Sequence, residues 1–459
     1  MANHYLVVSD LHLCDFEDHA DGWMAHKATR FAFDDAFDSL VKRFCARLAA
    51  EDQATLVLNG DILDFDLLTR VPATPPWPVS SSERQRGLAA TPEKSAWKAG
   101  EMLAAHPRFV STLASFLAVG HQVVFVMGNH DMELIFPEVQ AVIRSAISAA
   151  APEGAEVLTG LRFEPWFYYV PGEIYAEHGQ QYSYYTSFKD LHCPTISSNE
   201  GPLLALPMGN LSNRFLMTKM GFFNPHASDF ILNLFAYFWH WLRYYAFSRR
   251  SLAWVWFWGS LVVMGRLLRI KKGQLRQESA CRDALAVKAA QCGVEVAVLE
   301  GMERLQQPPI TNRFFRIVRE FWIDRLLLLV LMVGGGLALI LTPTPLWVKF
   351  MIPLCVFPLV YLIYEAVIHG DTIFSIEKET PRVARQIAER LPAKVVTMGH
   401  DHVPRLLPLG REVTFVDTGT WAPIFKGESG QLARGYRNYL MATFREGELS
   451  YLFLGSDLP

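Results

Sequence analysis

Five short motifs rich in carboxylate, imidazole and amide groups occur along this chain in a fixed order. They are Asp10-x-His12, Gly60-Asp61-x-x-Asp64, Gly128-Asn129-His130-Asp131, His178-Gly179 and Gly399-His400-Asp401-His402. Oxygen and nitrogen ligands of these kinds suit divalent manganese, iron and zinc, whereas copper(I) prefers sulfur. The residue types therefore predict a metal centre.

The chemistry of such a centre follows from how two ions share ligands. Asp61 is the residue expected to bridge them, because one carboxylate can give an oxygen to each metal. Two ions about 3.5–4 Å apart can clamp a phosphoryl group and lower the pKa of a water molecule enough for hydrolysis. Asn129 would coordinate through a neutral amide oxygen, which adds no negative charge beside an anionic substrate. The set predicts a two-metal phosphoesterase centre.

The elements that must position these motifs alternate between strands and helices. Apolar runs predict strands at 5–9, 55–59, 122–127, 156–170, 173–177 and 394–398, with closing strands at 414–416 and 439–453. Helical patterns fall at 29–50, 93–118, 136–150 and 381–391, and residues 72–92 are expected to form a loop. This order predicts a layered α/β or αββα sandwich, with the motifs gathered where parallel strands end.

The motif set resembles that of the calcineurin-like metallophosphoesterase family over roughly residues 1–190 and 390–459. The resemblance implies a four-layer αββα sandwich with two divalent ions; manganese is the expected metal, with iron and zinc as alternatives. It implies that one metal is held by Asp10, His12, Asp61 and His402, and the other by Asp61, Asn129, His178 and His400.

The same resemblance implies two catalytic residues that bind no metal. His130 would contact the phosphoryl group or the leaving oxygen, and Asp131 is expected to orient its imidazole. Asp64 is interpreted as a group that supports a ligand or fixes the loop. Asp401 stands where the family usually has threonine or serine, and it either hydrogen-bonds a ligand histidine or points to solvent. The turn at 418–421 resembles a family loop beside the site, although an ordinary glycine turn explains it equally well.

Composition bounds what the rest of the chain can be. The 459 residues exceed the size at which one core stops growing, so a second part is expected. Hydrophobic residues make up 51% and charged residues only 19%, with the apolar surplus at about 226–368. A formal charge of −3 argues against nucleic acid as the main partner, and six cysteines without C-x-x-C pairing fit a reducing compartment.

The long segment between the fourth and fifth motifs is predicted to be a helical membrane insert. Residues 326–342 carry no charge and meet Pro343-Thr344-Pro345, after which 346–368 carry only two charges, the pattern of a hairpin of spanning helices. The aromatic-rich runs 230–247 and 251–264 would span or lie in the interface, giving two or four spans. The predicted domains are 1–190 and 376–459, which form the phosphoesterase, and 191–375, the insert. A buried helical lid is the alternative.

These features predict a membrane phosphoesterase with its catalytic domain on the cytoplasmic face. The expected substrate is a phosphate, phosphodiester or pyrophosphate, lipid-linked in the first interpretation and a soluble small molecule in the second. A non-catalytic membrane scaffold is a third alternative, and oligomeric state is left open. The opening Ser9-Asp10-Leu11-His12-Leu13-Cys14 also resembles UDP-2,3-diacylglucosamine hydrolases, which have a shorter insert and arginine at the place of His130.

Overall fold

Two β-sheets lie at the centre of the molecule. The structure, a computed structural model, describes residues 2–19, 24–219, 242, 252–274, 281–368, 376–410, 412–426, 431–432 and 437–456. The larger sheet has the order β15-β14-β1-β2-β3-β4 and comprises β1 (Ala2–Val8), β2 (Gln53–Asn59), β3 (Gln122–Val126), β4 (Leu161–Glu164), β14 (Asn438–Arg445) and β15 (Glu448–Ser456). Strands β1 to β4 are parallel, while β14 is antiparallel to β1, so segments from the two ends of the sequence meet in one sheet.

The smaller sheet brings together strands from both sides of the long insert. Its order is β10-β11-β9-β6-β5, with β5 (Phe167–Val170), β6 (Ile174–Glu177), β9 (Val395–Met398), β10 (Arg405–Pro408) and β11 (Thr414–Asp417). Strand β9 is parallel to both β6 and β11, and the two edge strands are antiparallel. The pairing of β6 with β9 places the fourth and fifth motifs side by side.

The two sheets pack face to face through a layer of small apolar side chains. Val7, Val57 and Val124 occupy neighbouring register positions on three strands of the larger sheet, and they share a buried cluster with Val395 and Val416 of the smaller one. β-branched side chains suit such a layer because they pack well on a pleated surface.

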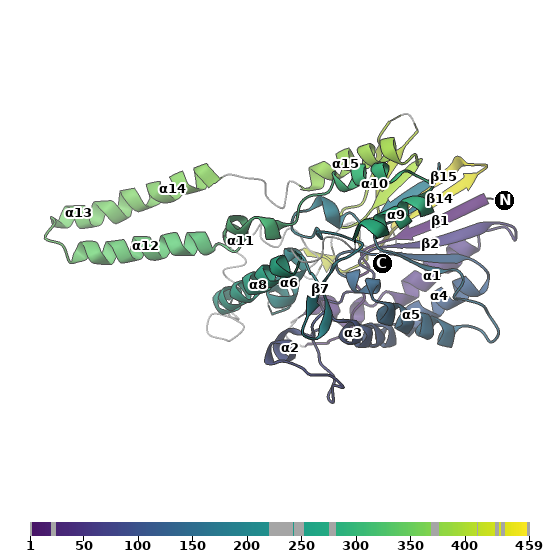
Figure 1. Ribbon diagram of the computed structural model, residues 1–459, viewed down its shortest axis with the longest axis horizontal. Coiled ribbons are helices and arrows are strands. Elements are labelled where there is room, and N and C mark those ends of the chain that lie inside the picture. Colours follow the sequence, from purple (N-terminus) through teal and green to yellow (C-terminus); the bar gives the residue numbers. More distant parts are fainter. Residues whose placement is uncertain are drawn as a thin grey trace.

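Helices cover the outer faces of both sheets (Figure 1). The larger sheet is covered by α1 (Asp34–Cys45), α3 (Pro92–Ala105), α4 (Pro107–Ala118) and α5 (Pro137–Ala150), and the smaller one by α9 (Cys281–Cys292), α10 (Val296–Glu303) and α15 (Ile376–Arg390). The predicted four-layer αββα sandwich is confirmed.

The largest error in the predicted elements was to expect one helix where the structure has two, separated at a proline. The expected helix 93–118 is two helices, α3 and α4, because Pro107 starts a new helix after His106 leaves the helical conformation. The expected loop 72–92 contains a short helix, α2 (Ser81–Arg86). No sequence pattern predicted the hairpin of β7 (Thr195–Ser198) and β8 (Gly201–Leu204), or α6 (Met208–Phe215). Minor elements are β12 (Phe425–Lys426), β13 (Gln431–Leu432) and 3₁₀ turns at Ala25–Lys27, Thr29–Phe31, Met132–Ile135, Gln180–Tyr182, Met217–Lys219 and Ile310–Asn312.

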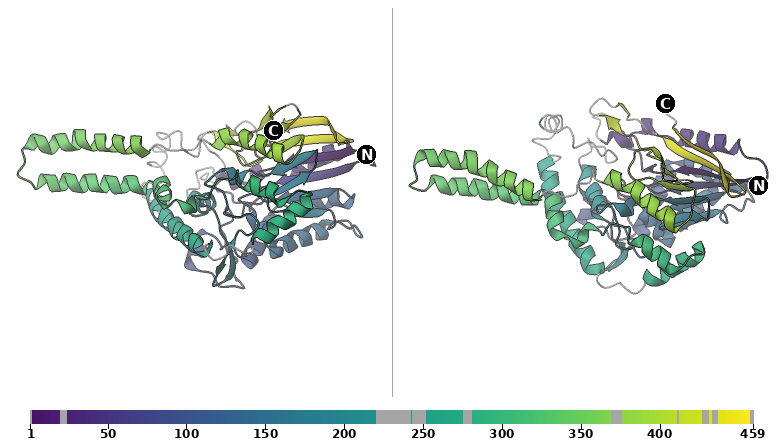
Figure 2. Two further views of the ribbon diagram at one scale, coloured as in Figure 1. Left: turned by 45° about the horizontal axis from the view of Figure 1, so that its top comes forward. Right: turned by 90° about the horizontal axis from the view of Figure 1, so that it is seen from above.

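A helical hairpin projects from the sandwich in every view (Figures 1 and 2). Its first arm is α12 (Ile323–Ile340); its second arm is α13 (Leu346–Met351), a π-helical turn (Ile352–Val356) and α14 (Phe357–Ile368) in one continuous run. By length and composition, each arm is sufficient to cross a membrane, and its apolar stretch is unburied. Within the described part of the chain these are the two helices that meet that criterion.

The segments before the hairpin are also helical. Residues 252–264 of the run 251–264 belong to one longer helix, α8 (Leu252–Gln274), whose Val263 and Leu267 are buried where it packs near α6. Apart from residue 242, the run 230–247 lies outside the described residues. Between α8 and the hairpin stand α9, α10 and α11 (Phe314–Glu320). The domain boundaries at 190 and 376 stay a prediction.

Candidate metal centre

Each of the five motifs begins at or just after the end of a strand. Asp10 follows β1 by two residues, Asp61 follows β2, Asn129 follows β3, His178 directly follows β6, and His400 follows β9. The first three strands are parallel neighbours in one sheet, and the last two are parallel neighbours in the other. Because the carboxyl ends of parallel strands meet at one edge, the two packed sheets bring all five loops to one place.

Two clusters of potential ligand atoms result. Asp10, His12 and His402 form one, and Asp61, His178 and His400 form the other, with the ligand atoms of each cluster within 4.8 Å of one another. Nε2 of His402 lies 3.1 Å from Oδ1 of Asp10, and Nε2 of His178 lies 3.0 Å from Oδ2 of Asp61. Two ligand atoms at about 2.1 Å from one ion and at right angles to each other would be about 3.0 Å apart, so these spacings fit shared cations.

Asn129 stands on the loop after β3, and the backbone N–H of the next residue, His130, donates to Oδ1 of Asp61 at 2.7 Å. The Asn129 side chain is buried, and its Oδ1 has no hydrogen-bond partner among the described residues, while Nδ2 donates to Oδ1 of Asn210 at 3.4 Å. A buried amide oxygen without a donor is costly unless something else satisfies it. Together with the oxygen and nitrogen character of its neighbours, this orphaned atom fits a divalent cation.

Backbone geometry at the site departs from what ordinary residues adopt. Nine described residues other than glycine have positive φ angles, and five of these nine are expected ligands: Asp10, His12, Asp61, His400 and His402. Such conformations cost free energy and persist when the surrounding structure over-determines them. Their concentration here marks the loops as shaped for ligand placement.

Motif glycines let one loop approach the side chain of another. A Cβ atom on Gly128 would lie 2.2 Å from Oδ1 of Asp61, and one on Gly399 would lie 2.3 Å from Oδ2 of Asp10. Both distances are far inside van der Waals contact, so a side chain at either position would displace a carboxylate. These glycines are part of the site although they carry no ligand.

The expected ligand histidines are held by specific partners. Nδ1 of His12 lies 2.9 Å from Oδ2 of Asp64, and Nδ1 of His178 lies 3.1 Å from the carbonyl oxygen of Asn59. Contacts of this kind fix ring orientation and leave Nε2 available. Asp64 therefore contacts an expected ligand histidine, and its other oxygen accepts hydrogen bonds from the backbone N–H groups of Asp66 and Leu67.

The structure places Asp131 away from the expected orienting role. Its carboxylate accepts hydrogen bonds from the backbone N–H groups of Gly128 and Ile62 at 2.6 and 2.7 Å, so it ties the β3 loop to the β2 loop. The carboxylates nearest the His130 ring are those of Asp64 and Asp66, at 3.3 and 3.4 Å from Nδ1. The orienting role predicted for Asp131 therefore passes to this pair, because consecutive residues in the turn point in different directions.

Electrostatics at the site favour positive charge. Burial alone would lower the pKa of His178, but the carboxylates of Asp61 and Asp10 raise it to about 10. Burial likewise opposes protonation of His130, yet Asp64 and Asp61 raise its pKa well above the usual value. The same concentration of buried carboxylates attracts divalent cations.

Two uncertain interpretations from the sequence are resolved by contacts. Asp401 does not point freely to solvent, because it accepts a hydrogen bond from the Thr380 hydroxyl at 3.2 Å and lies 3.4 Å from Arg405. The 418–421 turn does adjoin the site, since Oγ1 of Thr420 and the backbone N–H of Trp421 donate to the carbonyl oxygen of Asp10.

Some residues of the site carried no sequence signal. Asn210 on α6 donates to Oδ2 of Asp66 at 2.7 Å and to the carbonyl oxygen of Asn129 at 2.8 Å. Oγ1 of Thr186 lies 3.1 Å from Nε2 of His400. Both residues sit outside the motifs, and only tertiary packing brings them to the centre.

Comparison with known proteins adds one finding. Residues 4–206 match the family described as calcineurin-like phosphoesterase, a stretch that holds the first four motifs but not the fifth. No curated protein matches the chain.

Proposed function

The chain is a metal-dependent phosphoesterase with a calcineurin-like phosphoesterase domain over residues 4–206, and we propose that it works at a membrane on a lipid-linked phosphate, phosphodiester or pyrophosphate. The observation that carries the membrane part is the projecting hairpin, whose apolar side chains stay exposed. A soluble phosphoester is the alternative substrate. All seven proposed metal ligands are present, which does not favour a non-catalytic scaffold.

The proposed ligand sets follow the two clusters. Asp10, His12 and His402 would hold one ion and Asn129, His178 and His400 the other, with Asp61 shared between them. Manganese is our first choice, with iron or zinc as alternatives. When bound, two such ions would supply Lewis-acid stabilisation of the phosphoryl oxygens and acidify a water molecule.

His130 is proposed to donate a proton to the leaving oxygen. Its side chain is 14% exposed, so a substrate can reach it, and Asp64 and Asp66 hold the ring from the protein side. Neither carboxylate belongs to the proposed ligand sets, so both remain to stabilise the imidazolium form. Asp131 contributes by fixing the two loops that carry Asp61 and Asn129.

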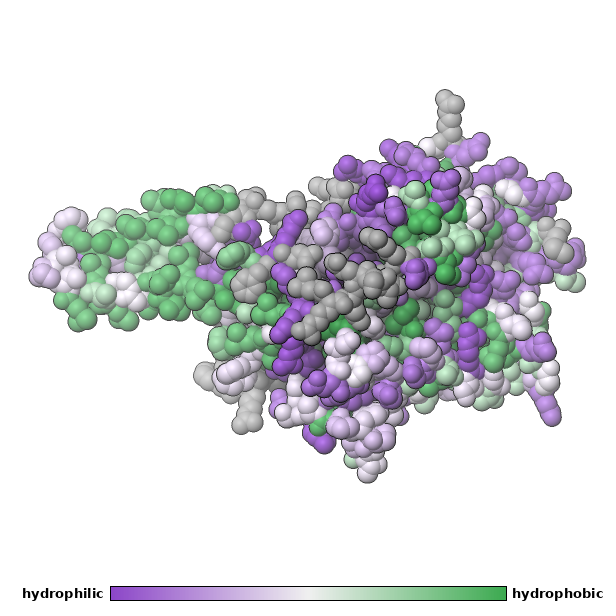
Figure 3. Space-filling view, in the orientation of Figure 1, coloured by the Kyte–Doolittle hydropathy of each residue, from purple (hydrophilic) through white to green (hydrophobic). Residues whose placement is uncertain are grey.

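The hairpin has the surface of a membrane-inserted element. Residues on both of its arms, such as Leu331 and Leu362, are exposed, and the space-filling view shows a hydrophobic surface along it (Figure 3). Each isolated charge would be expensive in lipid. Three of the hairpin's charged residues, Asp324, Arg325 and Glu365, stand at its base, where Arg325 makes a two-pronged contact with Glu365 at 2.6 and 3.0 Å, and Lys349 stands near the tip. An arm of 18 residues spans about 27 Å, close to the roughly 30 Å hydrocarbon layer.

Helix α8 offers a second membrane contact. Trp254, Phe257 and Trp258 are exposed near its beginning, whereas Lys271 and Lys272 stand in its last turn. Aromatic side chains favour the bilayer interface, and lysines favour anionic headgroups on the cytoplasmic side. The proposed orientation therefore has α8 lying along the cytoplasmic face.

Hydrogen bonds connect the hairpin base to the metal centre. The backbone N–H of Gln307 donates to the carbonyl oxygen of Gln181 at 2.8 Å, and the Tyr185 hydroxyl donates to Glu320 on α11 at 2.7 Å. Residues 180–186 directly follow His178, so the segment leading into the bilayer is fastened to the loop beside the site. A phosphate group at headgroup level would thus be near the catalytic loops.

Paired substrates test the proposal. Full-length protein in detergent with Mn²⁺ is assayed on phosphate esters, diesters and pyrophosphates, each in an acylated and a water-soluble form, such as phosphatidic acid and glycerol 3-phosphate. We expect a higher kcat/KM for the acylated member of the hydrolysed pair. A higher value for the soluble member would contradict the lipid assignment.

Matched variants test the residues. Asp61→Ala and His130→Ala should lose turnover while remaining folded, whereas Asp35→Ala and His19→Ala, which alter exposed side chains away from the motifs, should retain it. Turnover retained in Asp61→Ala would contradict the proposed ligand set.

A further inference from the structure

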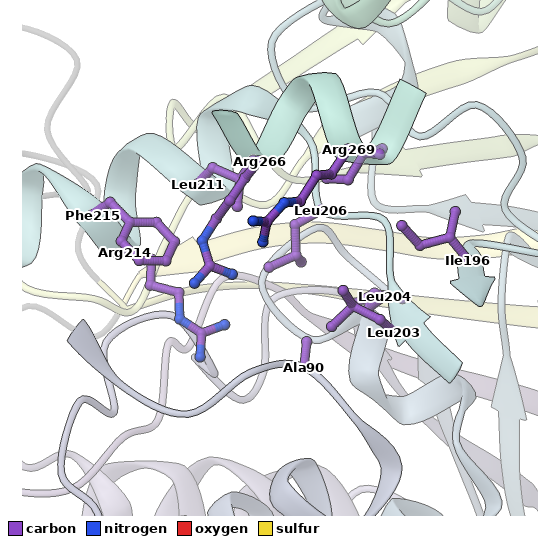
Figure 4. Close-up of a pocket in the computed structure, with 11 residues that line it drawn as sticks. Ala90, Ile196, Leu203, Leu204, Leu206, Leu211, Arg214, Phe215, Arg266 and Arg269 are labelled. Atoms are coloured by element: carbon purple, nitrogen blue, oxygen red, sulfur yellow. The ribbon is translucent and has the colours of Figure 1, made fainter. Parts of the chain in front are cut away.

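A pocket lined by apolar side chains and arginines lies beside α6 and α8 (Figure 4). The cavity measures about 60 Å³ and is bounded by α6, α8, the β7–β8 hairpin and Ala90. Leu204, Leu206 and Leu211 form part of its apolar wall, and Arg214, Arg266 and Arg269 bring three guanidinium groups to it. None of these residues belongs to the five motifs.

The most buried of the three arginines has unsatisfied donors. Arg214 is 3% exposed, and its Nε and Nη2 atoms have no hydrogen-bond partner among the described residues. Arg266 stacks over the Phe215 ring and makes a long contact of 3.5 Å with the Ser82 hydroxyl. Within the described part of the chain, no carboxylate lies within 4 Å of the three guanidinium groups. Burying such charge without a partner is costly.

More distant acids compensate this charge only in part. Glu83 is engaged by Lys94 at 2.7 Å, and Asp66 is engaged by Asn210. Burial, followed by the charge of Asp66, raises the pKa of Glu133 to about 8, which keeps much of that group neutral at pH 7. Burial and the neighbouring Arg214 and Arg269 in turn lower the pKa of Arg266 to about 10. The arginines therefore repel one another in a site where acids compensate their charge only in part.

We propose that this pocket is an anion subsite that binds a phosphate group, with its leucine wall receiving hydrocarbon attached to that group. Guanidinium groups recognise phosphate through several parallel N–H donors, and Arg214, which lines the pocket, has two such donors without a hydrogen-bond partner among the described residues. The inference is independent of the hydrolytic proposal, because the pocket residues are neither proposed ligands nor catalytic groups.

The pocket is coupled to the metal centre through one helix. Arg214 and Asn210 are four residues apart on α6, and Asn210 contacts both Asp66 and Asn129. Residues at this spacing share a helix face. An anion that draws Arg214 toward the pocket would therefore act on the helix that also supports Asn129.

Phosphate binding tests the subsite directly. Inorganic phosphate is titrated calorimetrically into full-length protein in detergent, once with saturating Mn²⁺ and once with EDTA. We expect binding that persists in EDTA, and a loss of about tenfold in affinity in Arg269→Gln and again in Arg266→Gln. Lys272→Gln, on the same helix but outside the pocket, should bind like the wild type. No binding in EDTA, or equal affinity in all variants, would overturn the proposal.

The fold should tolerate Arg269→Gln, because the Arg269 side chain is exposed and makes no described hydrogen bond. Arg269→Lys adds a charge-preserving comparison, in which intermediate affinity is expected. These readouts do not depend on turnover, so a failure of the subsite and a failure of the hydrolytic proposal are distinguishable.

A second titration distinguishes a lipid phosphate from free phosphate as the ligand. Dihexanoyl phosphatidic acid should bind at least tenfold more tightly than inorganic phosphate if the leucine wall receives hydrocarbon, because two buried methylenes already supply about that factor. Equal affinities would support the anion subsite and assign it to a free phosphate. Dihexanoyl phosphatidylcholine, whose choline offsets its charge, should bind weakly; tight binding of this lipid in both wild type and Arg269→Gln would refute recognition by the arginines.

Discussion

The hydroxyl of Thr186 lies 3.1 Å from Nε2 of His400, across 214 residues of sequence. Thr186 belongs to the loop that α11 fastens at the hairpin base, and His400 belongs to the fifth motif. One hydrogen bond thus joins the region leading to the hairpin to a proposed metal ligand.

Removing this hydroxyl should weaken the metal centre. Thr186→Val keeps the side-chain volume but loses the contact to His400, and lost contacts to ligand histidines typically lower metal affinity about 10–100-fold. Calorimetric titration with Mn²⁺ measures the change. Thr195→Val in β7 is the control, and equal affinity in the two variants would show that the Thr186 contact has no part in metal binding.

The glycine of the fifth motif should be intolerant of a single methyl group. In Gly399→Ala the new Cβ would collide with Oδ2 of Asp10, so we expect at least a tenfold loss of metal affinity with the fold retained. Gly410→Ala is a matched control, since no atom lies within 4 Å of its added Cβ. Metal content by elemental analysis distinguishes the two, and full occupancy in Gly399→Ala would contradict the described approach of the loops.

His130 should affect turnover far more than metal content. His130→Gln removes the proposed proton donor, for which a loss of about 10²–10⁴ in kcat is expected. Asp66→Asn, which removes one carboxylate beside the ring, should lower kcat less and shift the pH profile, because the imidazolium is then less stabilised. Metal content should match the wild type in both. An unchanged kcat in His130→Gln would exclude the proposed role.

A charge on the hairpin should release the protein from membranes. Leu331→Asp places a carboxylate on α12 at a side chain that is 71% exposed, and insertion of aspartate near a helix centre costs about 2.5–3.5 kcal/mol. Fractionation and flotation with vesicles measure the shift to the soluble fraction. Val119→Asp, at an equally exposed apolar position on the sandwich, should leave partitioning unchanged. Identical behaviour of the two variants would count against insertion of the hairpin.

The hydrogen bonds of the Glu83 carboxylate predict that the protein loses part of its free energy of unfolding in acid. Burial alone would raise its pKa, but hydrogen bonds from Lys94 and from the backbone N–H groups of Ala89 and Ser80 lower it to about 2. Since the folded-state pKa lies below the unfolded value of 4.5, the contribution is fully present above pH 4.5 and disappears as the pH falls toward 2. It amounts to at most about 3 kcal/mol.

Denaturant unfolding between pH 6 and pH 3 checks this expectation. Glu83→Gln keeps a side chain that can complete the capping box but loses the charge, so its stability should fall less steeply with acid than that of the wild type. Glu93→Gln, which changes an exposed side chain in the first turn of α3, should follow the wild-type slope. Parallel slopes for wild type and Glu83→Gln would contradict the prediction.

The fold and the ligand clusters were predictable because each depends on local patterns that recur. Apolar runs followed by Asp, Asn or His locate both the strands and their carboxyl ends, so Asp61 and His178 could be placed together although 117 residues separate them. Pro107 could have indicated the helix break, but the apolar pattern continues across it, so one helix was predicted.

The predictions that were wrong or missing concerned contacts that depend on the direction of side chains. Asp131 is adjacent to His130, but the turn sends its carboxylate toward Gly128 and Ile62, and the partners of His130 come from another loop. Asn210 and Arg214 have no motif at all; their roles arise only when α6 packs between the sandwich and α8. Sequence periodicity specifies which residues are buried, but not which buried polar atoms meet.

The left-handed backbone of five proposed ligands has a cost that the whole protein carries. Each such residue is about 1 kcal/mol less favourable in this conformation than glycine would be, so the backbone of the proposed metal site is strained. Glycine at any of the five would relieve this backbone strain but would remove a side chain proposed to bind metal. Low backbone strain and metal binding therefore require different residues at these five positions, which follow the ends of the strands.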